Sequence, residues 1–75
     1  MTDWRAIIGA NVRRARQHAK LTQEQLAFEA QIDLTYVGGI ERGKRNPSVL
    51  VLARIAAALH TEPAALLERR DDQNR

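Results

Sequence analysis

Hydrophobic residues recur along most of the chain at the spacing of helix turns. From about residue 3 to residue 19, apolar side chains stand three or four positions apart. That spacing places them on one side of a helix, because side chains three and four residues apart share a face. They are Trp4, Ile8, Val12, Ala15 and Ala19. Since no segment alternates apolar and polar residues with a period of two, the pattern predicts an all-α fold.

Four further helices are predicted where capping residues precede apolar positions. Thr22, followed three residues later by a glutamine, forms a capping-box pattern. Asp33 and Ser48 are good N-caps for the next two helices, and Pro63 suits the first position of a short fifth helix over residues 63–69. The residues expected to face inward are Leu26, Ala27, Ala30, Val37, Ile40, Val49, Leu52, Ile55, Ala56, Leu59, Ala64, Leu66 and Leu67.

Length and charge narrow the classes of function. The 75 residues suffice for one small domain, expected over residues 1–69, with a polar and disordered tail at 70–75. Twelve Lys and Arg residues against nine Asp and Glu give a net charge of +3, which favours a polyanionic partner. Ten of the twelve are arginine, which suits bidentate contacts to phosphate or guanine. The composition therefore favours a nucleic-acid partner.

Several other classes are disfavoured by what the sequence lacks. Without cysteine, neither a disulfide framework nor a thiolate metal site can form. The longest apolar run, Val49 to Ala53, is far too short to span a bilayer, and the first ten residues lack the apolar block of a signal peptide. No nucleophile–base pairing is found, and His18 and His60 are interpreted as structural. We therefore expect a cytoplasmic protein that is not an enzyme, with no cofactor and no metal.

Residues 23–40 have the spacing of two short helices joined by a tight turn. Counting from Gln23, apolar or small residues occupy the fourth, eighth, tenth, fifteenth and eighteenth positions, and alanine holds the fifth. Ala27 must be small because two helices so joined cross close to it. Since all of these packing positions are filled, the spacing indicates a DNA-binding helix-turn-helix.

The stretch "LTQEQLAFEAQIDLTYVGGIERGKRNPS" resembles the lambda-repressor-like family of Cro and repressor-type (XRE-type) DNA-binding domains, over Val12 to Leu67. Within that family, "DLTYVGGIERGKRN" is similar to the controller proteins of restriction-modification systems. The resemblance implies a compact five-helix domain with the helix-turn-helix at helices two and three. It also implies a transcriptional regulator that binds a pseudo-palindromic operator as a homodimer, with half-site centres about 34–36 Å apart or a multiple of that. Such a protein acts by occupying double-stranded DNA or by contacting RNA polymerase.

The first group of expected DNA contacts lies at two helix N-termini. Gln23 begins the second helix, where free N–H groups and the helix dipole attract phosphate. The resemblance implies that Gln23 contacts the DNA backbone. Leu34 and Thr35 begin the third helix, the end that enters the major groove in this docking mode. Thr35 can hydrogen-bond a base and Leu34 can touch a thymine methyl group. For Tyr36, packing between helices and a contact to the DNA backbone are both open.

The second group lies at the end of the third helix and in the loop after it. Arg42 and Lys44 are expected at phosphates, and the resemblance gives Arg45 a role in base recognition. Gly38 and Gly39 are expected on the outward side of the helix, where their lack of side chains would bring the helix backbone close to DNA. The third helix should end at Gly43, because glycine is the usual residue just past a helix C-terminus.

Other positions support the fold or depart from the family pattern. The resemblance implies that Arg16 and Glu41 pair between helices one and three. Many relatives have glycine where this chain has Lys20, Gln31 and His60, so these three positions either are strained in the left-handed conformation or belong to a different turn.

The dimer contact and the class of function leave alternatives. Leu66 and Leu67 are expected either to fill the core or to form a two-fold dimer contact. An antitoxin-type regulator would bind a partner protein as well as DNA, and co-purification of that protein would favour it. A basic amphipathic first helix, with Trp4, Ile7 and Ile8 beside four arginines, would instead lie on a membrane surface. The complete helix-turn-helix pattern favours DNA and no membrane.

Overall fold

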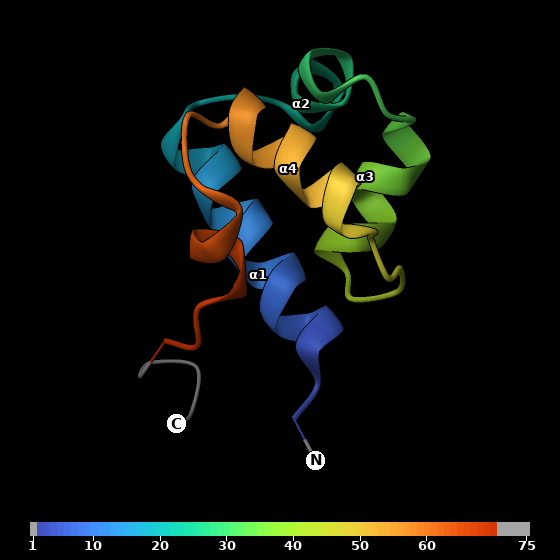
Figure 1. Ribbon diagram of the computed structural model, residues 1–75. Coiled ribbons are helices and arrows are strands. Elements are labelled where there is room, and N and C mark those ends of the chain that lie inside the picture. The colour runs from blue at the N-terminus through green and yellow to red at the C-terminus, as the bar shows by residue number, and fades with distance from the viewer. Residues whose placement is uncertain (1, 71–75) are drawn as a thin grey trace.

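The computed structural model describes residues 2–70 as a bundle of four α-helices followed by one short 3-10 helix (Figure 1). The elements are α1 (Trp4–His18), α2 (Gln23–Ala30), α3 (Leu34–Glu41), α4 (Val49–Ala58) and the 3-10 helix η1 (Pro63–Leu67). The all-α prediction is confirmed. A short helix does begin at Pro63 as expected, but it is a 3-10 helix of five residues that ends at Leu67 instead of residue 69, so the expected count of five α-helices is not matched. Of the tail expected at 70–75, residues 71–75 lie outside the described residues.

Side-chain caps begin the four α-helices. Asp3 accepts a hydrogen bond from the backbone N–H of Ala6 at 3.2 Å and starts α1. At α2 the capping box is complete: the Thr22 hydroxyl accepts from the Gln25 N–H, and the Gln25 side chain accepts from the Thr22 N–H. The predicted caps of α3 and α4 also accept backbone hydrogen bonds. Each cap satisfies a helix N–H that would otherwise lack a partner.

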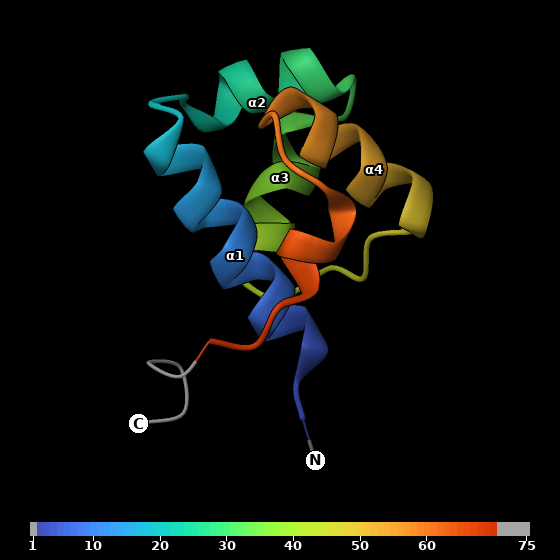
Figure 2. The ribbon, with the colours of Figure 1, turned by 60° about the vertical axis from the view of Figure 1, so that its left-hand side comes forward.

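The core lies where α1, α3 and η1 meet α2 and α4, and Figure 2 shows α3 behind α1 and η1. Its buried hydrophobic residues are Ile8, Val12, Leu26, Ala27, Ala30, Val37, Ile40, Leu52, Ile55, Ala56, Leu59 and Leu66. Five residues expected on the apolar sides of helices are exposed instead: Trp4 by 47%, Val49 by 76% and Leu67 by 42%, together with the small residues Ala19 and Ala64. Trp4 and Val49 each stand at the first residue of a helix. Helical spacing identifies a side of a helix, but it does not show how far along that side a neighbouring helix reaches.

At Gly9, α1 comes very close to the backbone of α3. A Cβ atom placed on Gly9 would collide with the carbonyl oxygen of Ile40 and would lie 2.9 Å from that of Glu41. These obstacles are backbone atoms of a helix, which cannot rotate aside as a side chain can. Glycine at this position therefore sets the distance between α1 and α3, a requirement that the sequence pattern did not reveal.

Three helix ends adopt the left-handed conformation without glycine. Lys20, Gln31 and His60 have φ values of 63°, 59° and 57°, while Gly43 has a φ of 74° after α3. Of the two alternatives left by the sequence, the strained one is observed: the three residues adopt the left-handed conformation that glycine adopts at these positions in many relatives. Each non-glycine residue in this conformation costs about 1–2 kcal/mol, because its Cβ crowds the backbone.

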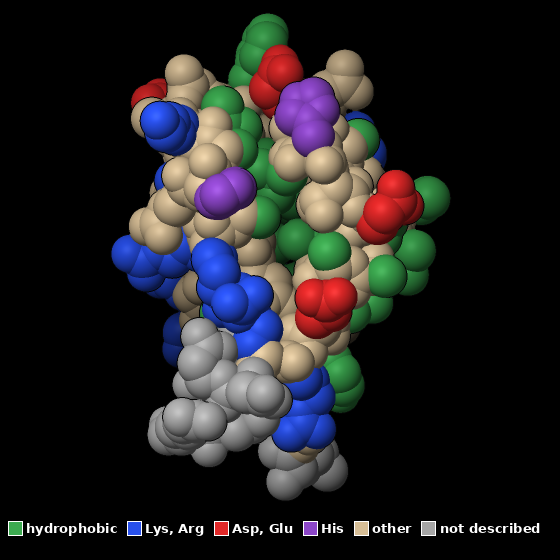
Figure 3. All heavy atoms as spheres, turned by 90° about the vertical axis from the view of Figure 1, so that its left-hand side faces the viewer, with side chains coloured by type: hydrophobic (Ala, Val, Ile, Leu, Met, Phe, Trp, Pro, Cys, Tyr) green, Lys and Arg blue, Asp and Glu red, His purple; other side chains and the backbone are tan. Residues whose placement is uncertain are grey.

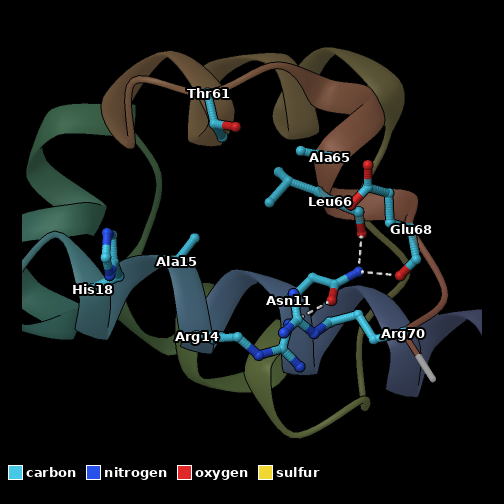
Figure 4. A pocket seen from close by; sticks show the side chains of 9 residues that line it. All are labelled: Asn11, Arg14, Ala15, His18, Thr61, Ala65, Leu66, Glu68 and Arg70. Carbon is cyan, nitrogen blue, oxygen red and sulfur yellow. Dashed lines mark hydrogen bonds between the residues drawn. The ribbon is translucent and has the colours of Figure 1, made fainter. Parts of the chain in front are cut away.

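A buried asparagine fastens the C-terminal segment to α1. The Asn11 side chain donates to the carbonyl oxygens of Leu66 at 2.9 Å and Glu68 at 2.8 Å, and its own oxygen accepts from Arg14. Figure 4 shows these groups in the wall of a hollow between α1 and η1. Because η1 is too short to be stable alone, these bonds and the buried Leu66 hold it in place.

Candidate nucleic-acid interface

Two short helices joined by a tight turn form the centre of the candidate site. The left-handed Gln31 reverses the chain after α2, and the N–H of Ile32 donates to the carbonyl oxygen of Ala27 at 3.0 Å. Ala27 itself is buried, as expected for the small residue of this motif. The turn therefore fixes α3 against α2 in a helix-turn-helix arrangement.

A second set of contacts fixes the C-terminal end of α3 to α1. Arg16 donates to both carboxylate oxygens of Glu41, from Nε at 2.7 Å and from Nη2 at 3.1 Å. The side chains are only 13% and 3% exposed, and this hydrogen bonding raises the already high pKa of Arg16. The expected pair between helices one and three is confirmed. Arg16 also donates to the carbonyl oxygen of Leu21, which ties the loop before α2 to the same network.

Gln23 belongs to this network, which the sequence did not predict. Its side-chain nitrogen donates to Glu41 Oε1 at 3.0 Å. An amide nitrogen carries two hydrogens, so one N–H remains for a ligand after the bond to Glu41 is made. Glu41 thus holds α1, α2 and α3 together at one point and orients the residue predicted to contact phosphate.

The first turn of α3 is open to solvent. Asp33 accepts from the N–H of Thr35 at 2.7 Å, which fixes the direction in which the helix begins. Thr35 is exposed and Leu34 is 42% exposed, whereas Val37 and Ile40 on the other side are buried. The N-terminal end of α3 thus presents a hydroxyl and an apolar side chain on an anchored helix.

The basic loop after α3 lies on the same outer side of the helix. Arg42, Lys44 and Arg45 are all exposed, and the Arg45 guanidinium lies 5.7 Å from the centre of the Tyr36 ring. Tyr36 is partly buried against the core, which supports the packing role that was left open for it. A cation at this distance over an aromatic face is attracted to the ring.

Gly38 and Gly39 do not present open backbone to solvent. Both are buried, because a Cβ on Gly38 would meet the end of Arg42 and a Cβ on Gly39 would meet the stem of Arg45. The glycines are on the outer side of α3, as predicted. In the protein without DNA, side chains of Arg42 and Arg45 occupy the space beside the two glycines, so a close approach of the helix backbone to DNA requires these arginines to move.

One expected dimer residue is also corrected. Leu66 is 1% exposed and belongs to the core of the domain, so its side chain is not available to a partner. Leu67, its neighbour, remains accessible at 42%. The 3-10 turn at η1 points consecutive side chains in different directions, which explains why the two leucines differ.

Charge alone does not identify the DNA-binding side. Figure 3 shows the face turned away from α3, where Lys and Arg side chains gather below the histidines. Basic residues are therefore present on more than one face, and the position of the helix-turn-helix distinguishes the candidate interface. The apolar side of α1 packs against α3 and η1, which opposes the membrane-surface alternative. Within residues 2–70, no helix has the length and apolar character needed to cross a membrane.

Comparison with known proteins agrees with this arrangement. Residues 12–66 match the protein family described as Helix-turn-helix, and the chain therefore belongs to the helix-turn-helix family of transcriptional regulators. The narrower similarity is to controller proteins of restriction-modification systems. The chain is 40% identical over 65 residues to Control protein C.BamHI of Bacillus amyloliquefaciens, covering 85% of this chain and 80% of that protein.

Two further relatives extend the similarity to the full domain and to its fold. Control protein C.SmaI of Serratia marcescens is 39% identical over 72 residues, which cover 96% of this chain and 86% of that protein. The crystal structure of the restriction-modification controller protein C.AhdI from Aeromonas hydrophila superimposes with a TM-score of 0.81 at 42% identity. That match covers 83% of this chain and 94% of the other.

Proposed function

We propose that this regulator binds double-stranded DNA as a homodimer and controls the genes of a restriction-modification system. One observation carries the proposal: the exposed first turn of α3 and the exposed basic loop after it lie on one outer side of an anchored helix. The similarity to two control proteins and to a restriction-modification controller protein supports the narrower role. In this proposal the protein acts in the cytoplasm, without chemistry of its own, by occupying a promoter or by contacting RNA polymerase.

The contacts divide into those that position the protein and those that read bases. Thr35 and Leu34 enter the major groove with the N-terminal end of α3, and Arg45 adds a guanidinium that suits guanine. Lys44 and Arg42 neutralise phosphates, and the second amide hydrogen of Gln23 donates to another phosphate. Base contacts then determine sequence, whereas phosphate contacts determine most of the salt dependence.

The homodimer is proposed because one domain of this size spans only a few base pairs. Leu67 in η1 offers one exposed apolar side chain, and Val49 and Leu50 at the start of α4 offer two more. Substitution by glutamate on the contact surface should convert a dimer to a monomer, as measured by sedimentation. Comparing Leu67→Glu with Leu50→Glu identifies which surface is used.

Selection of bound sequences from a random DNA pool tests the proposal. The expected result is a pseudo-palindromic site with half-site centres about 34–36 Å apart or a multiple of that distance. Affinity for this site should fall as salt rises, with a log–log slope of about −0.9 per phosphate neutralised. Enrichment of no sequence, or binding that does not change with salt, would contradict the proposal.

Point variants then separate reading from positioning. Thr35→Ala should lower discrimination between the selected site and random DNA by about 1–3 kcal/mol. Lys44→Ala should weaken binding to both DNAs by similar factors, because a phosphate contact carries no sequence information. If Thr35→Ala also lowers both affinities equally, then Thr35 contacts the DNA backbone instead.

A further inference from the structure

On the outer side of α3, the side chain of Arg45 packs against Gly39, and the proposed DNA contacts do not account for this packing. A Cβ atom on Gly39 would lie 2.6 Å from Cγ, 3.3 Å from Nε and 3.5 Å from Cδ of Arg45. The Arg45 side chain therefore lies in the volume that any other residue at position 39 would occupy. Gly39 is buried by this contact although it stands on the outer side of the helix.

Two more interactions hold the same arginine. The Arg45 guanidinium lies 5.7 Å from the centre of the Tyr36 ring. Tyr36 precedes Gly39 by three residues, so the two share a side of α3. In addition, the N–H of Lys44 donates to the carbonyl oxygen of Gly39 at 2.8 Å, which brings the loop back onto the helix next to Arg45.

We propose that Gly39 is a positioning residue, which seats the stem of Arg45 on α3 so that its guanidinium is oriented by Tyr36 before DNA binds. The inference rests on the proposed function, in which Arg45 contacts a base. An arginine side chain loses much rotamer freedom when it is immobilised in an interface. If part of that freedom is already lost in the free protein, less is lost on binding, and the guanidinium meets the base in a defined direction.

The neighbouring glycine provides a control within the same helix. A Cβ on Gly38 would lie 3.1 Å from Nη1 of Arg42 and 3.8 Å from Oε1 of Gln23. Both atoms are at the far ends of flexible side chains, which can shift by a small rotation. At Gly39, by contrast, the obstacle is Cγ, near the backbone, and moving it displaces the whole Arg45 side chain.

The decisive experiment compares Gly39→Ala with Gly38→Ala on the selected site and on random DNA. Gly39→Ala should lower the ratio of the two affinities by about five- to tenfold, the effect of ordering one arginine at the interface. Gly38→Ala lies beside Arg42 and Gln23, whose proposed contacts are to phosphate, so any loss of binding should be the same for both DNAs and the ratio should change by less than about twofold. An unchanged or increased ratio for Gly39→Ala, or equal losses for both variants, would overturn the proposal.

A double-substitution cycle shows whether Gly39 acts through Arg45. In an Arg45→Ala background the guanidinium is absent, so adding Gly39→Ala should change discrimination no further. A loss of the same size in both backgrounds would mean that the added methyl group acts on the DNA directly.

A measurement without DNA separates this inference from the proposed function. In the free protein, NMR signals of the Arg45 side chain should be shifted by the Tyr36 ring, and Gly39→Ala should return them toward values of an unstructured arginine. Gly38→Ala should leave them shifted. Unshifted Arg45 signals in the unsubstituted protein would show that the Arg45 side chain is not held against Gly39 and Tyr36, and would refute the inference. Shifted signals in a protein that selects no DNA sequence would refute the proposed function and, with it, the role in reading bases.

Discussion

The inner and outer sides of α3 differ in what the glycines and the charged side chains on them contact. On the inner side, Gly9 of α1 faces backbone carbonyl groups of α3, and Glu41 is held by three hydrogen bonds from Arg16 and Gln23. On the outer side, Gly38 and Gly39 face arginine side chains. Backbone in a packed helix cannot yield, whereas an exposed side chain can. The inner side is therefore specified by the requirements of folding, and the outer side remains adjustable for contact with a ligand.

The largest expected effect is the loss of the inner ion pair. Glu41→Ala leaves Arg16 and Gln23 without their shared partner in a mostly buried place, so the free energy of unfolding should fall by about 3 kcal/mol. Urea denaturation at a fixed protein concentration measures this change. Glu29→Ala, at an exposed position of α2, serves as the control and should change stability by less than about 0.5 kcal/mol. A loss below about 1 kcal/mol for Glu41→Ala would mean that the pair behaves like one exposed to solvent.

The same substitution at glycines on the two sides should have opposite signs. Gly9→Ala should destabilise the domain by about 2 kcal/mol, because α1 must move away from α3 to admit the methyl group. Gly38→Ala should stabilise it by about 0.5–1 kcal/mol, the usual gain of alanine over glycine within a helix. Thermal unfolding of the two variants measures both changes. If Gly9→Ala were neutral, the helices could separate without loss, and the distinction between the two sides would disappear.

A finer difference is expected between the two outer glycines. From the sequence, alanine at either position should give the same gain in stability. In the structure, Gly39→Ala also displaces Arg45 from Tyr36, and such a cation–π contact contributes about 0.5–1 kcal/mol at an exposed site. We therefore expect Gly39→Ala to be close to neutral while Gly38→Ala stabilises. Equal stabilisation in denaturant titrations would show that the Arg45 contact has no measurable energy.

The sequence predicted what depends on neighbouring residues and missed what depends on distant ones. The helix starts at Thr22, Asp33 and Ser48 could be predicted, because each cap accepts a hydrogen bond from an N–H only two or three residues further along the chain. The resemblance supplied the pair between Arg16 and Glu41. Neither source supplied the Gln23 contact to Glu41 or the Asn11 clamp, whose partners are 18 and more than 50 residues away. No local pattern marks such contacts.

The sequence also failed to predict which apolar residues at the ends of helices are exposed to solvent. Periodicity placed Trp4 and Val49 on the apolar sides of α1 and α4, yet both are exposed. Similarly, the period of α3 placed Gly39 outward, but it could not reveal that Arg45 folds back over it. The assignment of DNA-contacting residues stays a prediction, because it depends on a partner whose position is not determined by the fold.

The smallest expected effect concerns the turn between α2 and α3, which belongs neither to the inner nor to the outer side of α3. Gln31 adopts a φ of 59°, where a residue with a Cβ is strained by about 1–2 kcal/mol. Glycine relieves that strain but loses about 0.5–1 kcal/mol through the greater freedom of the unfolded chain. Gln31→Gly should therefore raise the free energy of unfolding by about 0.5 kcal/mol, as measured by urea denaturation. Glu29→Gly in the preceding helix should instead lower it by about 1 kcal/mol. A loss at Gln31 equal to that at Glu29 would mean that the Gln31 side chain contributes contacts that outweigh the strain of its backbone.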